Sequence, residues 1–390
     1  MSTTTKTRRT RKSYKDMTTE EKAKCREAAQ AKKDSWIQDF ADQIIKKLRK
    51  KQAPWQKPWT DEGIQAFPRN YLTGKNYRGA NVVYLWMQGY DDPRWMTFKQ
   101  AKSKGFKVRK GEKGTQIIYW KFLEKEEEVE DLTSGETVTV KRRIPMTKFY
   151  TVFNAEQIDG VEALPKPKKV TKAQMAKRVK RAEQLVKKSK AVINYNSVRG
   201  AYYTPMLDQI SMPPREAFKS TEGFYGTLLH ELSHWTGHVS RMNREMQGFG
   251  GKRKIEYAKE ELHAEIGCWM LCGEIGVPHD PEQHMSYVSS WARIIKQDPF
   301  EIIKATQTAA KIMDYLLQFD ATTVRRKKAE AKAAAEAEEK KNADAKPEAK
   351  KPTAKKPTTK KPTATKKPTT RKPRASRPRS TSAPRPAATA

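Results

Sequence analysis

Apolar side chains in the first 160 residues change their spacing several times, and each spacing predicts an element. Between residues 36 and 48 they recur every three or four positions, which predicts an amphipathic helix that ends before Pro54. The apolar runs further on predict helices over 81–88 and 97–104 and strands over 115–122, 137–144 and 150–153. The acidic run 124–136 is expected to be a loop. We therefore expect an α+β domain over residues 31–160, preceded by a disordered basic arm over residues 1–30.

The second half of the chain has mainly helical spacing. A linker rich in proline and lysine, residues 161–172, leads into a second domain over 173–322. This domain is expected to hold a helix over 172–190, strands near 191–195, 200–204 and 208–212, and helices over 221–237, 255–275, 283–296 and 299–319. Beyond it, residues 323–390 are rich in Lys, Pro, Thr and Ala. Frequent proline excludes a helix or strand from Lys351 onward, so we expect a disordered, extended tail, with transient helix at most over 329–350.

Charge and composition narrow the function. The 390 residues include 80 Lys and Arg against 45 Asp and Glu, a formal net charge of +35, which predicts a polyanionic partner. The basic N-terminus has no apolar segment typical of a secretion signal, and the apolar stretch 266–277 is too short to span a bilayer. Three cysteines exclude a disulfide scaffold and indicate a reducing compartment. We therefore expect a cytoplasmic protein without a membrane partner.

All six histidines lie between residues 230 and 284, and two of them form an H-E-x-x-H sequence. On a helix, His230 and His234 stand one turn apart on the same face, so both imidazoles can reach one ion. Glu231 lies beside them and can take a proton from a water molecule whose pKa Zn²⁺ lowers to about 7. The pattern predicts a zinc site with Glu231 as its general base.

A catalytic zinc needs a third protein ligand. His238 would lie roughly 12 Å along a continuing helix from His230, too far to share the ion. Glu261 and Glu265 share one face of the next helix, a spacing typical of thermolysin-like (gluzincin) sites. We expect Glu261 to bind the metal and Glu265 to orient a histidine ring, although the spacing alone also permits the reverse.

The remaining cysteines and histidines of this region have plainer interpretations. Cys268 and Cys272 could bind a metal through their thiolates, but with no further cysteine nearby we interpret them as small core residues. The other histidines are expected to be ordinary polar residues, one of which could stabilise an oxyanion: His263, His279 and His284.

Aromatic and cationic residues alternate through the N-terminal domain. Stacked rings beside phosphate-binding cations are what a groove for single-stranded DNA requires, although most of these rings must form the core. The candidate DNA-binding residues are Trp55, Lys57, Trp59, Arg69, Lys75, Tyr77, Arg78, Arg109, Lys110 and Lys113. The tail could also bind double-stranded DNA through its phosphates, or serve only to solubilise the chain.

Several separated motifs are similar to one family. In the first half they are WQKPW (55–59), PRN to RG (68–79), WMTF (95–98) and VRKGEKG (108–114); in the second half they are AYY (201–203), DQISMP (208–213), the histidine region 230–238 and residues 257–267. These segments resemble ArdC-type antirestriction proteins of plasmids and phages, whose N-terminal domain also begins TraC-type plasmid primases.

The resemblance implies single-stranded DNA binding, a zinc metallopeptidase fold with an unidentified peptide or protein substrate, and protection of incoming DNA from host restriction. It implies a location in the host cytoplasm, associated with DNA, or packaging in a virion. Three alternatives stay open: a non-enzymatic DNA-binding protein with a structural zincin core, a primase-accessory protein, and a DNA condenser that acts through its tail. No acidic metal-binding motif of a priming polymerase follows.

Overall fold

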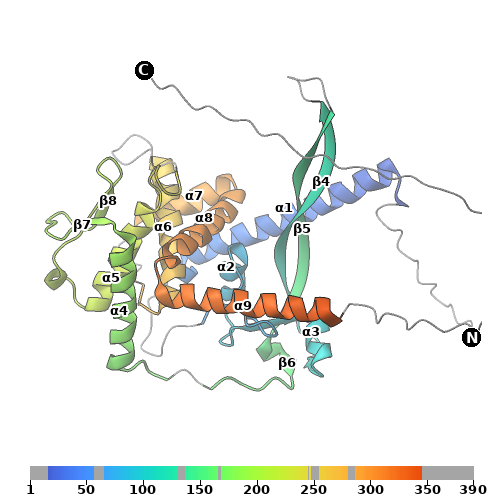
Figure 1. Ribbon diagram of the computed structural model, residues 1–390, viewed down its shortest axis with the longest axis horizontal. Helices are drawn as coiled ribbons and strands as arrows, with labels where there is room; N and C mark the ends of the chain where they lie inside the picture. The colour runs from blue at the N-terminus through green and yellow to red at the C-terminus, as the bar shows by residue number, and fades with distance from the viewer. Residues whose placement is uncertain are drawn as a thin grey trace, which may run out of the picture. The chain divides into compact units, whose positions relative to one another are not determined.

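The computed structural model describes residues 16–56, 66–130, 137–165, 168–244, 246, 254–279 and 286–344. The described residues up to Ala333 form one compact unit. Within the described residues no helix is both long enough and apolar enough to cross a membrane. The fold is a mixture of helices and sheets, as expected (Figure 1).

The first segment combines three helices with short strands and one long hairpin. Its elements are α1 (Thr19–Arg49), a 3-10 turn (Pro54–Gln56), β1 (Arg69–Asn70), α2 (Ala80–Trp86), β2 (Arg94–Thr97), α3 (Phe98–Ser103), β3 (Lys107–Val108), β4 (Thr115–Glu130), β5 (Thr137–Asn154), a second 3-10 turn (Ala155–Gln157) and β6 (Ile158–Asp159). The main sheet has the order β1-β2-β5-β4, and β3 pairs with β6.

Helix α1 begins much earlier than the apolar spacing predicts. Thr18 accepts a hydrogen bond from the backbone N–H of Glu21, and the Glu21 carboxylate accepts one from the backbone N–H of Thr18. This capping box starts the helix at Thr19, and a Glu20–Lys24 pair supports its exposed first turns. The prediction of a disordered arm over 1–30 is therefore wrong from Thr19 onward.

The predicted acidic loop is also corrected. β4 and β5 pair without interruption from Thr115 opposite Val152 to Glu130 opposite Thr137, so residues 124–130 are strand. The register sets Glu124 opposite Arg143. The strands predicted separately over 137–144 and 150–153 are one continuous strand.

The second segment follows the predicted order closely. It contains α4 (Lys172–Ser189), a small sheet of β7 (Val192–Asn194), β8 (Tyr202–Thr204) and β9 (Gln209–Ser211) in the order β7-β9-β8, a 3-10 turn (Arg215–Ala217), and the helices α5 (Thr221–Trp235), α6 (Lys254–Ile275), α7 (Val288–Gln297) and α8 (Phe300–Leu317). Helix α6 is packed against both α5 and α8 and is buried along most of its length.

The two segments share one hydrophobic core. The buried face of α1, which includes Trp36 and Phe40, joins the same cluster as Trp269 of α6 and Trp291 of α7. Trp291 also donates a hydrogen bond to the carbonyl of Ala258, at 2.9 Å, so its ring fixes α7 against α6. Helix α6, which carries the predicted metal ligand, is therefore held by packing from both segments.

Order does not end at residue 322 as predicted. Helix α9 spans Ala321–Asp344. Asp320 caps its start by accepting a hydrogen bond from the backbone N–H of Thr323, and the same carboxylate binds Arg181 of α4. The alanine-, glutamate- and lysine-rich sequence then propagates the helix. The lysine- and proline-rich part of the predicted tail, from residue 345, lies outside the described residues.

Candidate metal centre and nucleic-acid surface

Helix α5 carries the H-E-x-x-H sequence into the core. The Ser220 hydroxyl caps the helix by accepting a hydrogen bond from the backbone N–H of Gly223, and every residue from Phe224 to Trp235 is buried. His230 and His234 are 3% and 2% exposed, and their Nε2 atoms lie 3.1 Å apart. One helical turn thus aims both imidazoles at the same point, as predicted.

Glu261 of α6 faces this pair. Its Oε2 lies 3.7 Å from Nε2 of His230 and its Oε1 lies 3.6 Å from Nε2 of His234. The donor atoms of the three residues all lie within 4.8 Å of one another. Two imidazole nitrogens and a carboxylate oxygen are a donor set that Zn²⁺ accepts at about 2.0–2.2 Å each, so a small closing movement would fit the residues around one ion.

Glu265 lies behind the pair, one turn further along α6. Its Oε2 is 3.2 Å from Nδ1 of His230, the nitrogen that faces away from Glu261. Its Oε1 is 3.1 Å from Nε2 of His279. Glu261 therefore faces the Nε2 atoms of both histidines, whereas Glu265 faces Nδ1 of His230.

A second orienting pair was not predicted from the sequence. Oε1 of Glu260 lies 3.2 Å from Nδ1 of His234, and Arg244 donates to both carboxylate oxygens of Glu260, at 2.6 and 3.0 Å. Arg244 also donates to the carbonyl of Ser233 and the hydroxyl of Thr236, so it ties the end of α5 to α6. The sequence could have indicated this contact in one way: a metal-binding His234 also needs a hydrogen-bond acceptor for its Nδ1.

The electrostatics of the cluster suit a cation. Burial acts to lower the pKa of His230, but Glu261 and Glu265 outweigh it and raise that pKa to about 9. Burial acts in the same way on His234, whose pKa Glu261 and Glu260 raise to about 10. The carboxylates thus stabilise positive charge between the two buried imidazoles. A divalent ion would supply that charge in place of the protons on the imidazoles.

Two further side chains approach the cluster. Glu231, the predicted general base, is 6% exposed and directly follows His230 on α5. Tyr257, one turn before Glu261, hydrogen-bonds with Glu261 and Tyr287, and burial followed by the charge of Glu261 raises its pKa. The sequence alone does not indicate this phenol, because only the packing of α6 shows that it faces the cluster.

The cysteines lie behind the histidine cluster. Cys268 and Cys272 are fully buried, with sulfur atoms 3.7 Å apart, and these two sulfurs and a ring nitrogen of His279 all lie within 4.8 Å of one another. His279 was interpreted as an ordinary polar residue, but it is 3% exposed and its Nε2 lies 3.1 Å from both Glu265 and the carbonyl of Trp55. His263 lies 3.6 Å from Glu260, and His284 is outside the described residues.

The described DNA-binding candidates do not all lie at the surface. Trp55 is fully buried, and its carbonyl accepts from His279, so its predicted role as an exposed stacking ring is wrong. When aromatic residues alternate with cations, the sequence does not show which rings lie in the core and which lie at the surface. Tyr77 is half-buried and packs against the core. Lys57 and Trp59 lie outside the described residues.

The predicted cations are more accessible. Arg78 is exposed and forms an ion pair with Asp314, and Arg109 is exposed and pairs with Glu112 and Asp159. Arg69 is half-buried and lines a cavity. The exposed lysines among the candidates are Lys75, Lys110 and Lys113. Among the described candidates, the exposed cations are thus more available to an external ligand than the rings of Trp55 and Tyr77.

Two family models match the chain. Residues 34–153 match the N-terminal domain of anti-restriction factor ArdC, and residues 180–308 match a zincin-like metallopeptidase. These ranges cover the DNA-binding candidates and the histidine cluster respectively.

Solved structures match the fold as well. The metal-free crystal structure of the antirestriction ArdC protein from plasmid R388 is 39% identical, with a TM-score of 0.59, and the match covers 73% of this chain and 98% of that one. The Mn(II)-bound structure of the R388 protein gives 36% identity and a TM-score of 0.57 over the same shares. A curated relative, the DNA primase TraC of Escherichia coli, is 43% identical over 299 residues, which are 74% of this chain and 27% of TraC. The chain therefore spans about a quarter of that relative's length.

Proposed function

Because the chain belongs to the ArdC antirestriction family, we propose that it is a zinc-dependent peptidase that binds single-stranded DNA and protects the DNA of a mobile element from host restriction. Its substrate would be a protein of the host cell, and it would act in the host cytoplasm, where that DNA enters. The double-stranded DNA contacts proposed for the tail remain a separate property of residues beyond 344.

The observation that carries the peptidase proposal is the convergence of His230, His234 and Glu261 within 4.8 Å in a buried cluster, with Glu231 beside them. The donor set favours zinc. The R388 relative has been crystallised with Mn(II), so manganese is the metal to compare with it.

In this proposal each residue has a distinct task. A bound zinc ion would acidify a water molecule and polarise the scissile carbonyl. Glu231 takes the proton from the attacking water and delivers it to the leaving amine, as a general base and then a general acid. Glu265 and Glu260 hold the two imidazoles in the orientation that points Nε2 at the ion.

The DNA-binding proposal rests on the exposed cations of residues 34–153 and on the family match there. TraC carries the same two segments within a longer protein whose name is DNA primase, which is consistent with a partner that is unpaired during replication or transfer.

Glu231→Gln tests whether catalysis matters. This variant removes the general base and leaves the three proposed ligands in place, so zinc content and oligodeoxythymidine binding should be retained. Protection of a conjugatively transferred plasmid in a restricting host should be lost, as should any cleavage of casein in the presence of single-stranded DNA. Glu222→Gln, on the first turn of the same helix, is the matched control.

The non-enzymatic alternative predicts a different result. If Glu231→Gln protects plasmid transfer as well as the wild type does, the zincin segment is a scaffold and the peptidase proposal fails. If both variants protect poorly and have lost zinc, the folding of α5 is at fault, and unfolding curves would show this.

A further inference from the structure

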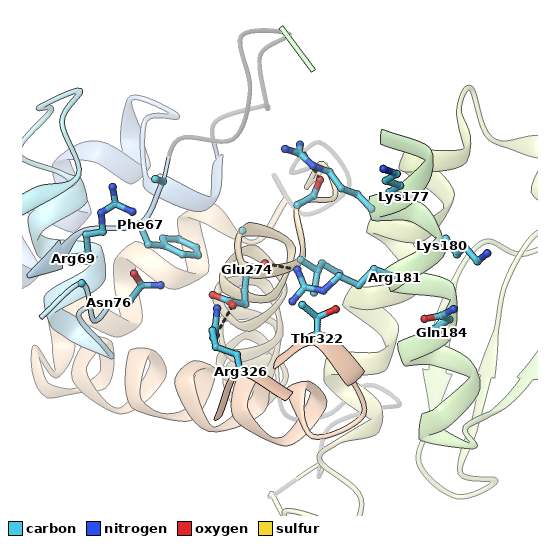
Figure 2. A pocket seen from close by; sticks show the side chains of 16 residues that line it. Phe67, Arg69, Asn76, Lys177, Lys180, Arg181, Gln184, Glu274, Thr322 and Arg326 are labelled. Atoms are coloured by element: carbon cyan, nitrogen blue, oxygen red, sulfur yellow. Dashed lines mark hydrogen bonds and ion pairs between the residues drawn. The ribbon is translucent and has the colours of Figure 1, made fainter. Parts of the chain in front are cut away.

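A cavity of about 760 Å³ is lined by residues other than those of the histidine cluster, and Figure 2 shows it from close by. One wall is formed by residues 66–76 of the first segment and the opposite wall by helix α4. The C-terminal end of α6, with Glu274, and the first turns of α9 lie between these walls. The cavity thus joins the segment that matches the ArdC N-terminal domain to the segment that matches the peptidase.

Cationic side chains dominate the lining. One carboxylate, Glu274, faces six cations: Arg69, Lys177, Arg178, Lys180, Arg181 and Arg326.

Two of the six cations already have structural partners. Arg181 binds Asp320 and the carbonyl of Glu274, and Arg326 pairs with the Glu274 carboxylate at 2.7 Å. Within the described part of the chain, the other four have no carboxylate within ion-pair distance. The cavity therefore carries an uncompensated positive charge.

Arg178 shows this excess most clearly. Its guanidinium is half-buried, and the one hydrogen bond found for it among the described residues is a long one, 3.5 Å, to the carbonyl of Gly276. Burial without an anionic partner lowers its pKa. A phosphate oxygen in the cavity would form the charge-assisted hydrogen bond that Arg178 lacks.

The lining also holds groups that suit a nucleobase. Phe67 is half-buried, with its ring set edge-on to Trp269 at a centroid distance of 5.0 Å, and it forms part of the wall opposite α4. Asn76 and Gln184 add amide donors and acceptors on the two sides (Figure 2). An aromatic ring among cations is the combination used by proteins that bind unpaired strands.

We propose that this cavity is a subsite for single-stranded DNA in which helix α4, a part of the peptidase segment, contacts the phosphodiester backbone. The inference rests on the proposed DNA binding and adds to it a surface outside residues 34–153. An unpaired strand can place both phosphates and bases in such a hollow, whereas a duplex keeps its bases stacked and paired. A strand bound there would touch both segments at once.

The test uses two pairs of lysines on the same helix. Lys177→Gln/Lys180→Gln removes two exposed cations that line the cavity, and Lys187→Gln/Lys188→Gln removes two exposed cations of α4 that do not. Both double variants change the net charge of the full chain equally. Binding of fluorescein-labelled oligodeoxythymidine is measured by anisotropy over a range of salt concentrations.

Each phosphate contact contributes about 0.7 to the slope of log affinity against log salt for a single strand, so loss of two contacts should make the slope about 1.4 shallower. Between 50 and 200 mM salt, the wild type and the control variant should then lose about 7-fold more affinity than Lys177→Gln/Lys180→Gln. Equal slopes for the two double variants would overturn the proposal.

Other outcomes separate this inference from the proposed function. If the wild type itself does not bind the oligonucleotide, the proposed DNA binding fails, and this inference fails with it. If it binds but a polyglutamate peptide competes as well as unlabelled oligodeoxythymidine, the occupant is an acidic peptide and the inference alone is overturned.

Cross-linking of a 4-thiothymidine oligonucleotide to the unmodified protein needs no variant to fold. Adducts on α4 or Phe67 support the subsite, and adducts confined to other segments contradict it.

Discussion

Removal of the Glu260 carboxylate should weaken both the fold and the metal site. Glu260 is 3% exposed and receives two hydrogen bonds from Arg244 while it lies 3.2 Å from Nδ1 of His234. Burial opposes its ionisation, but Arg244 and His234 outweigh that effect and hold the pKa of Glu260 well below its usual range. The surrounding residues therefore stabilise the ionised form of Glu260.

Glu260→Gln leaves the Arg244 guanidinium, whose side chain is 9% exposed, without its counter-charge. Breaking a buried pair in this way costs about 3–5 kcal/mol of unfolding free energy. Loss of the group that orients a metal-binding histidine typically costs 10–100-fold in metal affinity, and we expect roughly 10-fold because the glutamine oxygen can still accept from His234. Urea unfolding measures the first effect, and competition with a chromophoric zinc chelator measures the second.

Two further variants make the interpretation specific. Glu256→Gln, in the first turn of the same helix, should leave both quantities near the wild-type values. Adding Arg244→Gln to Glu260→Gln should restore part of the stability, since no buried charge remains unpaired, but should not restore zinc affinity. Wild-type zinc affinity in Glu260→Gln would refute the assignment of Glu260 as the orienting partner of His234.

Other predictions concern the core and acid stability. Trp55→Ala should lower the unfolding free energy by about 3–5 kcal/mol, because the ring is fully buried, and should leave oligonucleotide affinity unchanged below the unfolding temperature; weaker binding by the folded variant would restore Trp55 as a DNA contact. Burial acts to raise the pKa of Asp320, but Arg181 and Thr323 lower it to about 2, below the roughly 3.9 of an unfolded aspartate. The carboxylate should therefore contribute about 2 kcal/mol above pH 4, a contribution that disappears as the pH falls through 2. The difference in unfolding free energy between wild type and Asp320→Asn should shrink over that interval, and a difference independent of pH would contradict the pairing.

Local rules explain why much of the site was predictable. The i,i+4 spacing of His230 and His234, and of Glu261 and Glu265, fixes which side chains share a helix face before any packing is known. Helix boundaries in the second segment likewise follow from local caps and apolar spacing.

The residues that were missed depend on contacts between distant segments. Arg244 reaches Glu260 because residues 242–244 fold back onto the end of α5. His279 lies between Glu265 and the carbonyl of Trp55, which is distant in the sequence. Trp55 illustrates the opposite error. Its cationic neighbours in the sequence indicated that the Trp55 ring lies at the surface, but the ring is buried in the core that the two segments share.

The central claim is that His230, His234 and Glu261 hold one divalent ion, and metal content tests it most directly. After purification and dialysis against trace zinc, the wild type should retain a single zinc ion per chain by mass spectrometry, as should the His238→Ala control, whose side chain lies outside the cluster. His230→Ala and Glu261→Gln should each lose the ion while staying folded by circular dichroism. Retention of zinc by folded His230→Ala, or its loss from His238→Ala, would contradict the account.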